Sequence, residues 1–109
     1  MRWNDDQCIL AGGDAFTILQ LFPSNSVDLI VTDPPYHSTK KSNIVGDTDF
    51  KNDEDYLKWL EAYIKEWKRI LKPNGSIYCF CSSKMASKID VLMSGHFQVL
   101  TNITWTKPN

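Results

Sequence analysis

The sequence predicts an α/β fold in which three or four mainly parallel strands are flanked by helices. Three stretches support this prediction. Residues 27–32 are apolar and rich in β-branched side chains with one charge, which is typical of a buried strand in a parallel sheet. Residues 53–71 carry apolar side chains three or four positions apart, as an amphipathic helix does. Residues 76–81 form a second apolar run, so the three stretches predict a β-α-β crossover.

Length and composition favour one small soluble domain. The chain has 109 residues, of which 42% are hydrophobic and 23% are charged. Its net charge of −1 supplies no basic field to attract nucleic acid. The odd number of cysteines, three, argues against a disulfide framework and favours a cytoplasmic protein. No apolar run approaches the roughly 20 residues of a membrane-spanning helix, so we expect no membrane partner.

The N-terminal stretch predicts a strand, a tight turn and a short helix. Residues 7–11 are the strand, a Gly-Gly pair makes the turn, and the helix spans residues 15–21. Asp14 stands where its carboxylate can cap that helix. A carboxylate that follows a strand can also accept a hydrogen bond from a ligand, and the two roles are compatible.

The strand at 27–32 is stopped by the segment Asp33-Pro34-Pro35-Tyr36. Because the two prolines lack backbone N–H groups, the sheet ladder cannot continue through them. The result is a rigid segment at the carboxyl end of a strand, where open α/β sheets bind ligands. Asp33 and the Pro34 carbonyl can each accept one N–H of a nucleobase amino group, while Tyr36 stacks on the base. A base in a duplex reaches such a pocket only after it is flipped out.

Residues 37–53 are polar and predict a long loop, a length that in a compact domain is usually functional or disordered. Lys40 and Lys41 are either phosphate contacts or part of a solvated loop tip. His37 directly follows the motif and either touches the flipped base or is simply exposed.

Two more elements are expected after the strand at 76–81. Residues 84–93 predict a short helix, and the alternating apolar residues of 97–106 predict a strand. Cys79 and Cys81 share a strand face and lack partners for a metal site, so we expect buried small hydrophobes. Ser82 and Ser83 end their strand at the same sheet edge as Asp33, which makes either serine a candidate ligand contact.

The segment Asp33-Pro34-Pro35-Tyr36 resembles the catalytic motif of the S-adenosylmethionine-dependent DNA amino-methyltransferases, which methylate adenine N6 or cytosine N4. Residues 69–77 and residues 96–109 resemble the same family in the right order and spacing. The arrangement is most similar to the permuted, beta group. This resemblance implies a partial Rossmann-like class I methyltransferase fold and S-adenosylmethionine as the cofactor.

The resemblance also implies roles for individual residues, and no metal. The implied catalytic residues are Asp33, Pro34, Pro35 and Tyr36. The implied cofactor-binding residues are Asp14, Ala15, Asp33 and Ser82, with Asp14 at the wall of the adenine pocket. The implied contacts to the target base and DNA are Tyr36, His37, Lys40, Lys41 and Trp105.

The sequence departs from the family in what it lacks. It has five glycines but no G-x-G pattern, so the Gly-rich loop for the methionine end of the cofactor is absent. In the permuted group this loop and the DNA-recognition region come later in the chain. We therefore interpret residues 1–109 as a truncated catalytic domain, inactive alone, that acts on double-stranded DNA through the complete enzyme. A missing C-terminal half or a second chain would complete it, and the uncovered sheet edge predicts a homodimer or poor solubility.

Adenine N6 methylation of DNA by a prokaryotic or phage-type cytoplasmic enzyme, as in restriction-modification, is the predicted function. Cytosine N4 methylation is the nearest alternative, although the family then more often has Ser in place of Asp33. An enzyme acting on RNA or on protein glutamine is a further alternative. A non-catalytic remnant or partner subunit is the alternative from a different class, and the absent Gly-rich loop favours it.

Overall fold

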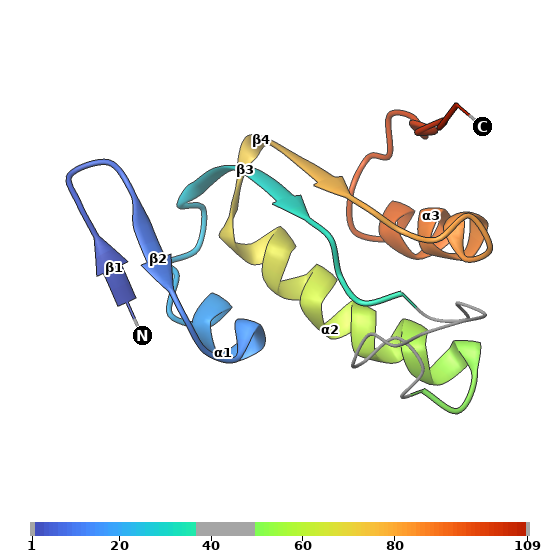
Figure 1. Cartoon of the computed structure of the whole chain (residues 1–109), viewed down its shortest axis with the longest axis horizontal. Coiled ribbons are helices and arrows are strands. Elements are labelled where there is room, and N and C mark those ends of the chain that lie inside the picture. The colour runs from blue at the N-terminus through green and yellow to red at the C-terminus, as the bar shows by residue number, and fades with distance from the viewer. Residues whose placement is uncertain (1, 37–49, 109) are drawn as a thin grey trace.

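The structure, a computed structural model, describes residues 2–36 and 50–108. Figure 1 shows an N-terminal hairpin at one end, the long helix α2 through the middle and α3 at the other end. In chain order the elements are β1 (Arg2–Asn4), β2 (Ile9–Ala11), α1 (Ala15–Leu19), β3 (Val27–Thr32), α2 (Asp53–Ile70), β4 (Leu71–Cys79) and α3 (Ala86–Ser94). The predicted α/β class is confirmed, with helices flanking a parallel pair of strands.

Strands β3 and β4 form the parallel pair, and α2 connects them. Ile30 pairs with Ile77 and Thr32 with Cys79. The predicted strand-helix-strand unit is therefore confirmed. The Phe80 N–H adds a hydrogen bond of 3.0 Å to the Thr32 carbonyl, so both strands end at the same edge of the sheet.

Strand β4 begins at Leu71, five positions before the predicted start at residue 76. Val27 pairs with Leu71 but Leu29 pairs with Ser76, so the intervening residues 72–75 form an irregularity in the ladder. Gly75 lies so close to β3 that an added Cβ would be 2.9 Å from the Asp28 carbonyl oxygen. Residues 72–75, Lys-Pro-Asn-Gly, thus follow the end of α2 and interrupt the regular ladder at the start of β4.

Helix α2 forms because its apolar residues recur three or four positions apart and its N-terminus is capped. Asn52 Oδ1 accepts a hydrogen bond of 2.8 Å from the Asp55 N–H, and three acidic residues occupy the first turn. The buried side chains of α2 are Tyr56, Leu60, Ile64, Trp67 and Ile70. With Met85, Ile89 and Met93 around α3 they form the core, against which Ile30, Ile77, Cys79 and Cys81 of the sheet side pack.

The other face of the β3–β4 pair is exposed and apolar. Leu29 and Val31 are 54% and 63% exposed, and Tyr78 and Phe80 are 52% and 41% exposed. Parallel strands are normally covered on both faces, so this surface is unusual for a parallel sheet. We expected apolar exposure at a sheet edge, and the structure has it on a sheet face. The homodimer stays a prediction.

The N-terminal strands form a separate antiparallel sheet. The predicted strand at 7–11 is present as β2, but it pairs with β1 in a hairpin rather than with β3. The turn between them is held by Asp5, whose Oδ1 accepts hydrogen bonds from the N–H groups of Gln7 (2.8 Å) and Cys8 (2.6 Å). In the described residues only β3 and β4 are parallel, so the expected third parallel strand is wrong for this part of the chain.

The predicted strand at 97–106 is also wrong, because residues 97–108 contain no helix or strand. Its alternating apolar side chains are outside the core: Leu100 is 83%, Ile103 75% and Trp105 77% exposed. Alternation gives a strand one apolar side, but a strand also needs a hydrogen-bonded neighbour, and the described residues supply none. The chain is packed as far as Phe97, whose N–H donates to the Met93 carbonyl at 2.8 Å.

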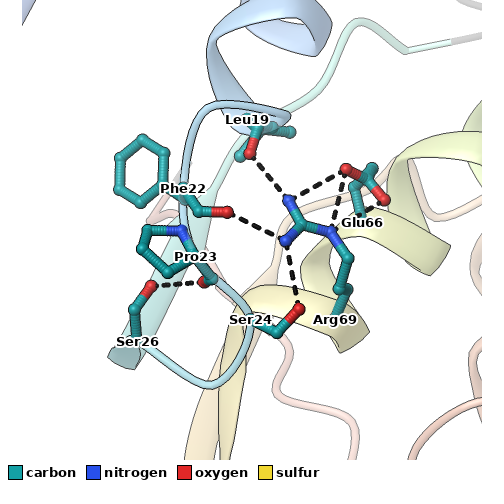
Figure 2. A network of polar contacts seen from close by, with 7 residues as sticks. All are labelled: Leu19, Phe22, Pro23, Ser24, Ser26, Glu66 and Arg69. Carbon is teal, nitrogen blue, oxygen red and sulfur yellow. Dashed lines mark hydrogen bonds and ion pairs between the residues drawn. The ribbon is translucent and has the colours of Figure 1, made fainter.

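Arg69 joins α2 to the connection between α1 and β3 (Figure 2). Its guanidinium donates to the carbonyls of Phe22 (2.8 Å) and Leu19 (3.1 Å), and it forms an ion pair with Glu66 at 3.1 Å. The Arg69 carbonyl in turn accepts a hydrogen bond of 2.9 Å from the Asn25 N–H. Since this connection leads directly into β3, the Arg69 contacts hold the chain at the point where β3 begins.

No helix in the described part of the chain is long and apolar enough to cross a membrane.

Candidate active site

The Asp33-Pro34-Pro35-Tyr36 segment continues from β3 beyond the last ladder bond. Thr32 closes the pairing with β4, and residues 33–36 belong to no helix or strand, as the two prolines require. Asp33 is exposed, whereas Tyr36 is half-buried. The carboxylate therefore stands at the carboxyl edge of the sheet, where it is accessible to a ligand, as predicted.

Tyr36 and Asp33 are joined within the segment. The Tyr36 hydroxyl donates a hydrogen bond to the Asp33 carboxylate. Burial raises the pKa of the Tyr36 phenol to about 12, and the hydrogen bond and the charge of Asp33 add to this effect. The phenol is thus neutral at any physiological pH and holds one acceptor site of the carboxylate. A carboxylate has about four such sites, so Asp33 can still accept from a second donor.

Cys79 and Cys81 lie at the same edge, and burial favours the protonated form of both thiols. Burial raises the pKa of the Cys79 thiol to about 12, with smaller contributions from Cys81 and Asp33. Burial also raises the pKa of the Cys81 thiol. Protonated thiols are poor nucleophiles and poor metal ligands, which fits the predicted role as small hydrophobes. Among the described residues no group of His, Cys, Asp and Glu could hold a metal ion.

Tyr56 is a residue of this site that the sequence pattern did not reveal. It lies in the first turn of α2, is only 1% exposed, and donates a hydrogen bond of 2.8 Å to the Pro35 carbonyl. The apolar period of residues 53–71 did not single out Tyr56. The available signal was chemical, because a buried tyrosine hydroxyl needs a hydrogen-bond partner.

Asp14 caps α1, as predicted. Its Oδ2 accepts hydrogen bonds from the N–H (3.0 Å) and the hydroxyl (2.8 Å) of Thr17, and these bonds lower the pKa of the carboxyl. Ala15 is the first residue of the helix. Burial raises the pKa of Tyr63 on α2, and the nearby charge of Asp14 adds to this effect. Asp14 lies near Tyr63, and the motif contacts Tyr56, which is seven residues earlier on α2. The two contact points are therefore roughly 10 Å apart along the helix axis.

Ser82 lies beyond the end of β4, at the same edge as Asp33, as predicted. Its hydroxyl accepts a hydrogen bond of 3.3 Å from the Met85 N–H, in the turn that leads into α3. Trp105 is 77% exposed in the segment after the packed core, so its place beside a target base stays a prediction. The predicted contacts His37, Lys40 and Lys41 lie outside the described residues.

Comparison with known proteins defines the class to which this arrangement belongs. Residues 27–109, which include the motif, the parallel pair and the C-terminal segment, match the N6/N4 methyltransferase family, described as DNA methylase. The chain belongs to this family, as the resemblance implied. Membership in a methyltransferase family implies, in general terms, S-adenosylmethionine as the cofactor.

Three relatives from bacteria illustrate the match. The chain is 46% identical over 70 residues to the type II methyltransferase M.BglII of Bacillus subtilis, covering 61% of this chain and 17% of the relative. It is 32% identical to the DNA adenine methyltransferase YhdJ of Escherichia coli, covering 96% of this chain and 35% of the relative. It is 31% identical to the type II methyltransferase M.HinfI of Haemophilus influenzae, covering 97% of this chain and 33% of the relative. The chain therefore spans about a third or less of the length of these relatives.

Proposed function

We propose that the full-length protein is a DNA adenine N6 methyltransferase that acts on a flipped base. One observation carries the proposal: an exposed carboxylate and two prolines end the parallel strand β3, in a chain of the N6/N4 methyltransferase family. The name of the relative YhdJ, a DNA adenine methyltransferase, supports adenine as the target.

The chemistry assigned to the segment is to hold an amino group and direct its lone pair. Asp33 accepts one N–H of the adenine amino group and the Pro34 carbonyl accepts the other. Two acceptors at fixed angles favour a more tetrahedral nitrogen, whose lone pair then points away from the ring. Because the base stays neutral, positioning rather than strong base catalysis lowers the barrier. Tyr36 supplies the face on which the base stacks. The Tyr36 hydroxyl then either turns away from Asp33 or shares the Asp33 carboxylate with the adenine amino group.

The cofactor would be S-adenosylmethionine, which supplies an electrophilic methyl group when bound. The described residues fit part of it. Thr17 occupies Asp14 Oδ2, which leaves Asp14 Oδ1 to accept from a ligand, and Ser82 presents a hydroxyl at the edge that carries Asp33. The described residues show no Gly-rich loop for the methionine end. We assign that loop, together with DNA recognition, to the rest of the full-length protein.

The proposed partners follow from the same assignment. Double-stranded DNA is the substrate of the full-length cytoplasmic protein, and residues 1–109 are its catalytic part, inactive when isolated. The apolar face formed by Leu29, Val31, Tyr78 and Phe80 fits a surface that the remainder of the protein covers, since parallel strands are normally buried on both faces.

Nucleoside analysis tests the target base. Plasmid DNA from a strain without DNA methylation is incubated with the full-length protein and S-adenosylmethionine, digested to nucleosides and analysed by mass spectrometry. We expect N6-methyladenine and no N4-methylcytosine. N4-methylcytosine in its place would assign the alternative target, and neither product would favour the non-catalytic interpretation.

A further inference from the structure

We propose that Tyr56 is a positioning residue for methyl transfer and acts through the Pro35 carbonyl; this inference rests on the proposed function. The Tyr56 hydroxyl donates a hydrogen bond of 2.8 Å to the Pro35 oxygen. The bond connects the first turn of α2 to a segment 21 residues earlier in the chain. It is a direct link from the core to the catalytic segment.

The donor of this bond is rigidly held. Tyr56 is 1% exposed, and its ring packs edge-on against Phe50 with centroids 5.1 Å apart and obliquely against Trp59 at 5.8 Å. The first turn of α2 is itself fixed, because Asn52 Oδ1 accepts a hydrogen bond of 2.8 Å from the Asp55 N–H. The Tyr56 hydroxyl is therefore a fixed point against which the catalytic segment is oriented.

The Pro35 carbonyl is an effective point at which to hold the segment. Neither Pro34 nor Pro35 has an N–H, so this part of the backbone can be anchored only through its carbonyl groups. Two torsions of Pro35, φ and ψ, separate the Pro34 carbonyl from the Pro35 carbonyl. The proline ring sets φ at about −65°, so a bond that fixes ψ also orients the Pro34 carbonyl. That carbonyl is the proposed second acceptor for the amino group.

Removal of the Tyr56 hydroxyl should therefore lower the rate of the chemical step more than cofactor binding. Tyr56→Phe keeps the ring in the core and removes the hydrogen bond to the Pro35 carbonyl. Because a misplacement of about 1 Å can lower a rate about a hundredfold, we expect the single-turnover rate constant for methyl transfer to fall at least about tenfold. The Kd for S-adenosylmethionine should change less than about twofold, since the hydroxyl contacts the catalytic segment and not the proposed cofactor residues.

Tyr63→Phe is the matched control. Tyr63 lies two turns further along α2, is also partly buried, and accepts a hydrogen bond from the Phe16 backbone N–H. Its ring packs against Phe16 at 5.2 Å, on the side of α2 that faces α1. Both variants thus lose one phenol hydroxyl that bonds to backbone, and only Tyr56 bonds to the catalytic segment. The rate constant of Tyr63→Phe should stay within about twofold of the wild-type value.

The experiment uses the full-length protein in excess over methylation-free plasmid DNA, with tritiated S-adenosylmethionine and a parallel measurement of Tm. The rate is measured at a temperature below the Tm of all variants. A loss of rate in Tyr56→Phe but not in Tyr63→Phe supports the positioning role. A wild-type rate in Tyr56→Phe, or an equal loss in Tyr63→Phe, overturns it. Asp33→Ala in the same assay separates the two claims. If Asp33→Ala is inactive and Tyr56→Phe is normal, only this inference fails; if Asp33→Ala retains transfer, the proposed function fails and the inference with it.

Discussion

Helix α2 buries its apolar side chains, whereas the segment 98–108 exposes its own. Leu60 and Ile64 of α2 are 0% exposed, while Ile103 and Trp105 are 75% and 77% exposed. The helix packs against α1, α3 and β4, and the segment pairs with no strand in the described residues. The difference teaches that an apolar pattern contributes to stability only where another element covers it.

The largest effect expected from this contrast is that of a truncation in the core. Ile64→Ala removes a fully buried core side chain of α2, so it should lower the free energy of unfolding by about 3 kcal/mol. Urea denaturation of the full-length protein, followed by circular dichroism, measures the change.

Ile103→Ala is the control for this prediction, because it is the same substitution at a 75% exposed position. It should change the free energy of unfolding by less than about 0.5 kcal/mol. A loss at residue 103 as large as that at residue 64 would show that the C-terminal segment is covered in the full-length protein, and the contrast would then hold only for residues 1–109.

Replacement of Arg69 should have a smaller effect. Arg69→Met keeps the apolar stem but removes the hydrogen bonds to Leu19, Phe22 and Ser24 and the ion pair with Glu66. Since these bonds are partly exposed, we expect the free energy of unfolding to fall by about 1–2 kcal/mol.

Lys65→Met tests whether that loss is specific to the Arg69 contacts. Lys65 is an exposed cation on the same helix, and its loss should cost less than about 0.5 kcal/mol. Equal effects of the two substitutions, measured by the same urea titration, would contradict the role given to Arg69 at the start of β3.

The sequence predicted those parts of the fold that depend on local signals. Helix α2 was predicted within one residue at its C-terminus, because the apolar period that predicts it is a local signal. Strand β3 and its end at the prolines were predicted for the same reason. The early start of β4 was missed, because it depends on how Gly75 fits beside the Asp28 carbonyl. The strand expected at 97–106 failed, because alternation does not say whether a neighbouring strand is present.

In the candidate site, too, the features that depend on local sequence could be predicted and those that depend on distant contacts could not. The position of Asp33 at the carboxyl edge of the sheet follows from the strand and the prolines, so it could be predicted. The bond from Tyr36 to Asp33 and that from Tyr56 to Pro35 could not, because they depend on side-chain placement in three dimensions. Tyr56 is 21 residues from its acceptor, and no local pattern pairs the two.

The most direct test of the account is methyl transfer by the full-length Asp33→Ala variant. Tritium transfer from S-adenosylmethionine to methylation-free plasmid DNA is measured next to Asp28→Ala, which removes an exposed carboxylate from β3 itself, where it pairs with Lys72 at 3.0 Å. The account predicts that Asp33→Ala abolishes transfer while much of the cofactor binding remains, and that Asp28→Ala stays active. Turnover retained by Asp33→Ala would contradict the claim that this segment is the site of methyl transfer.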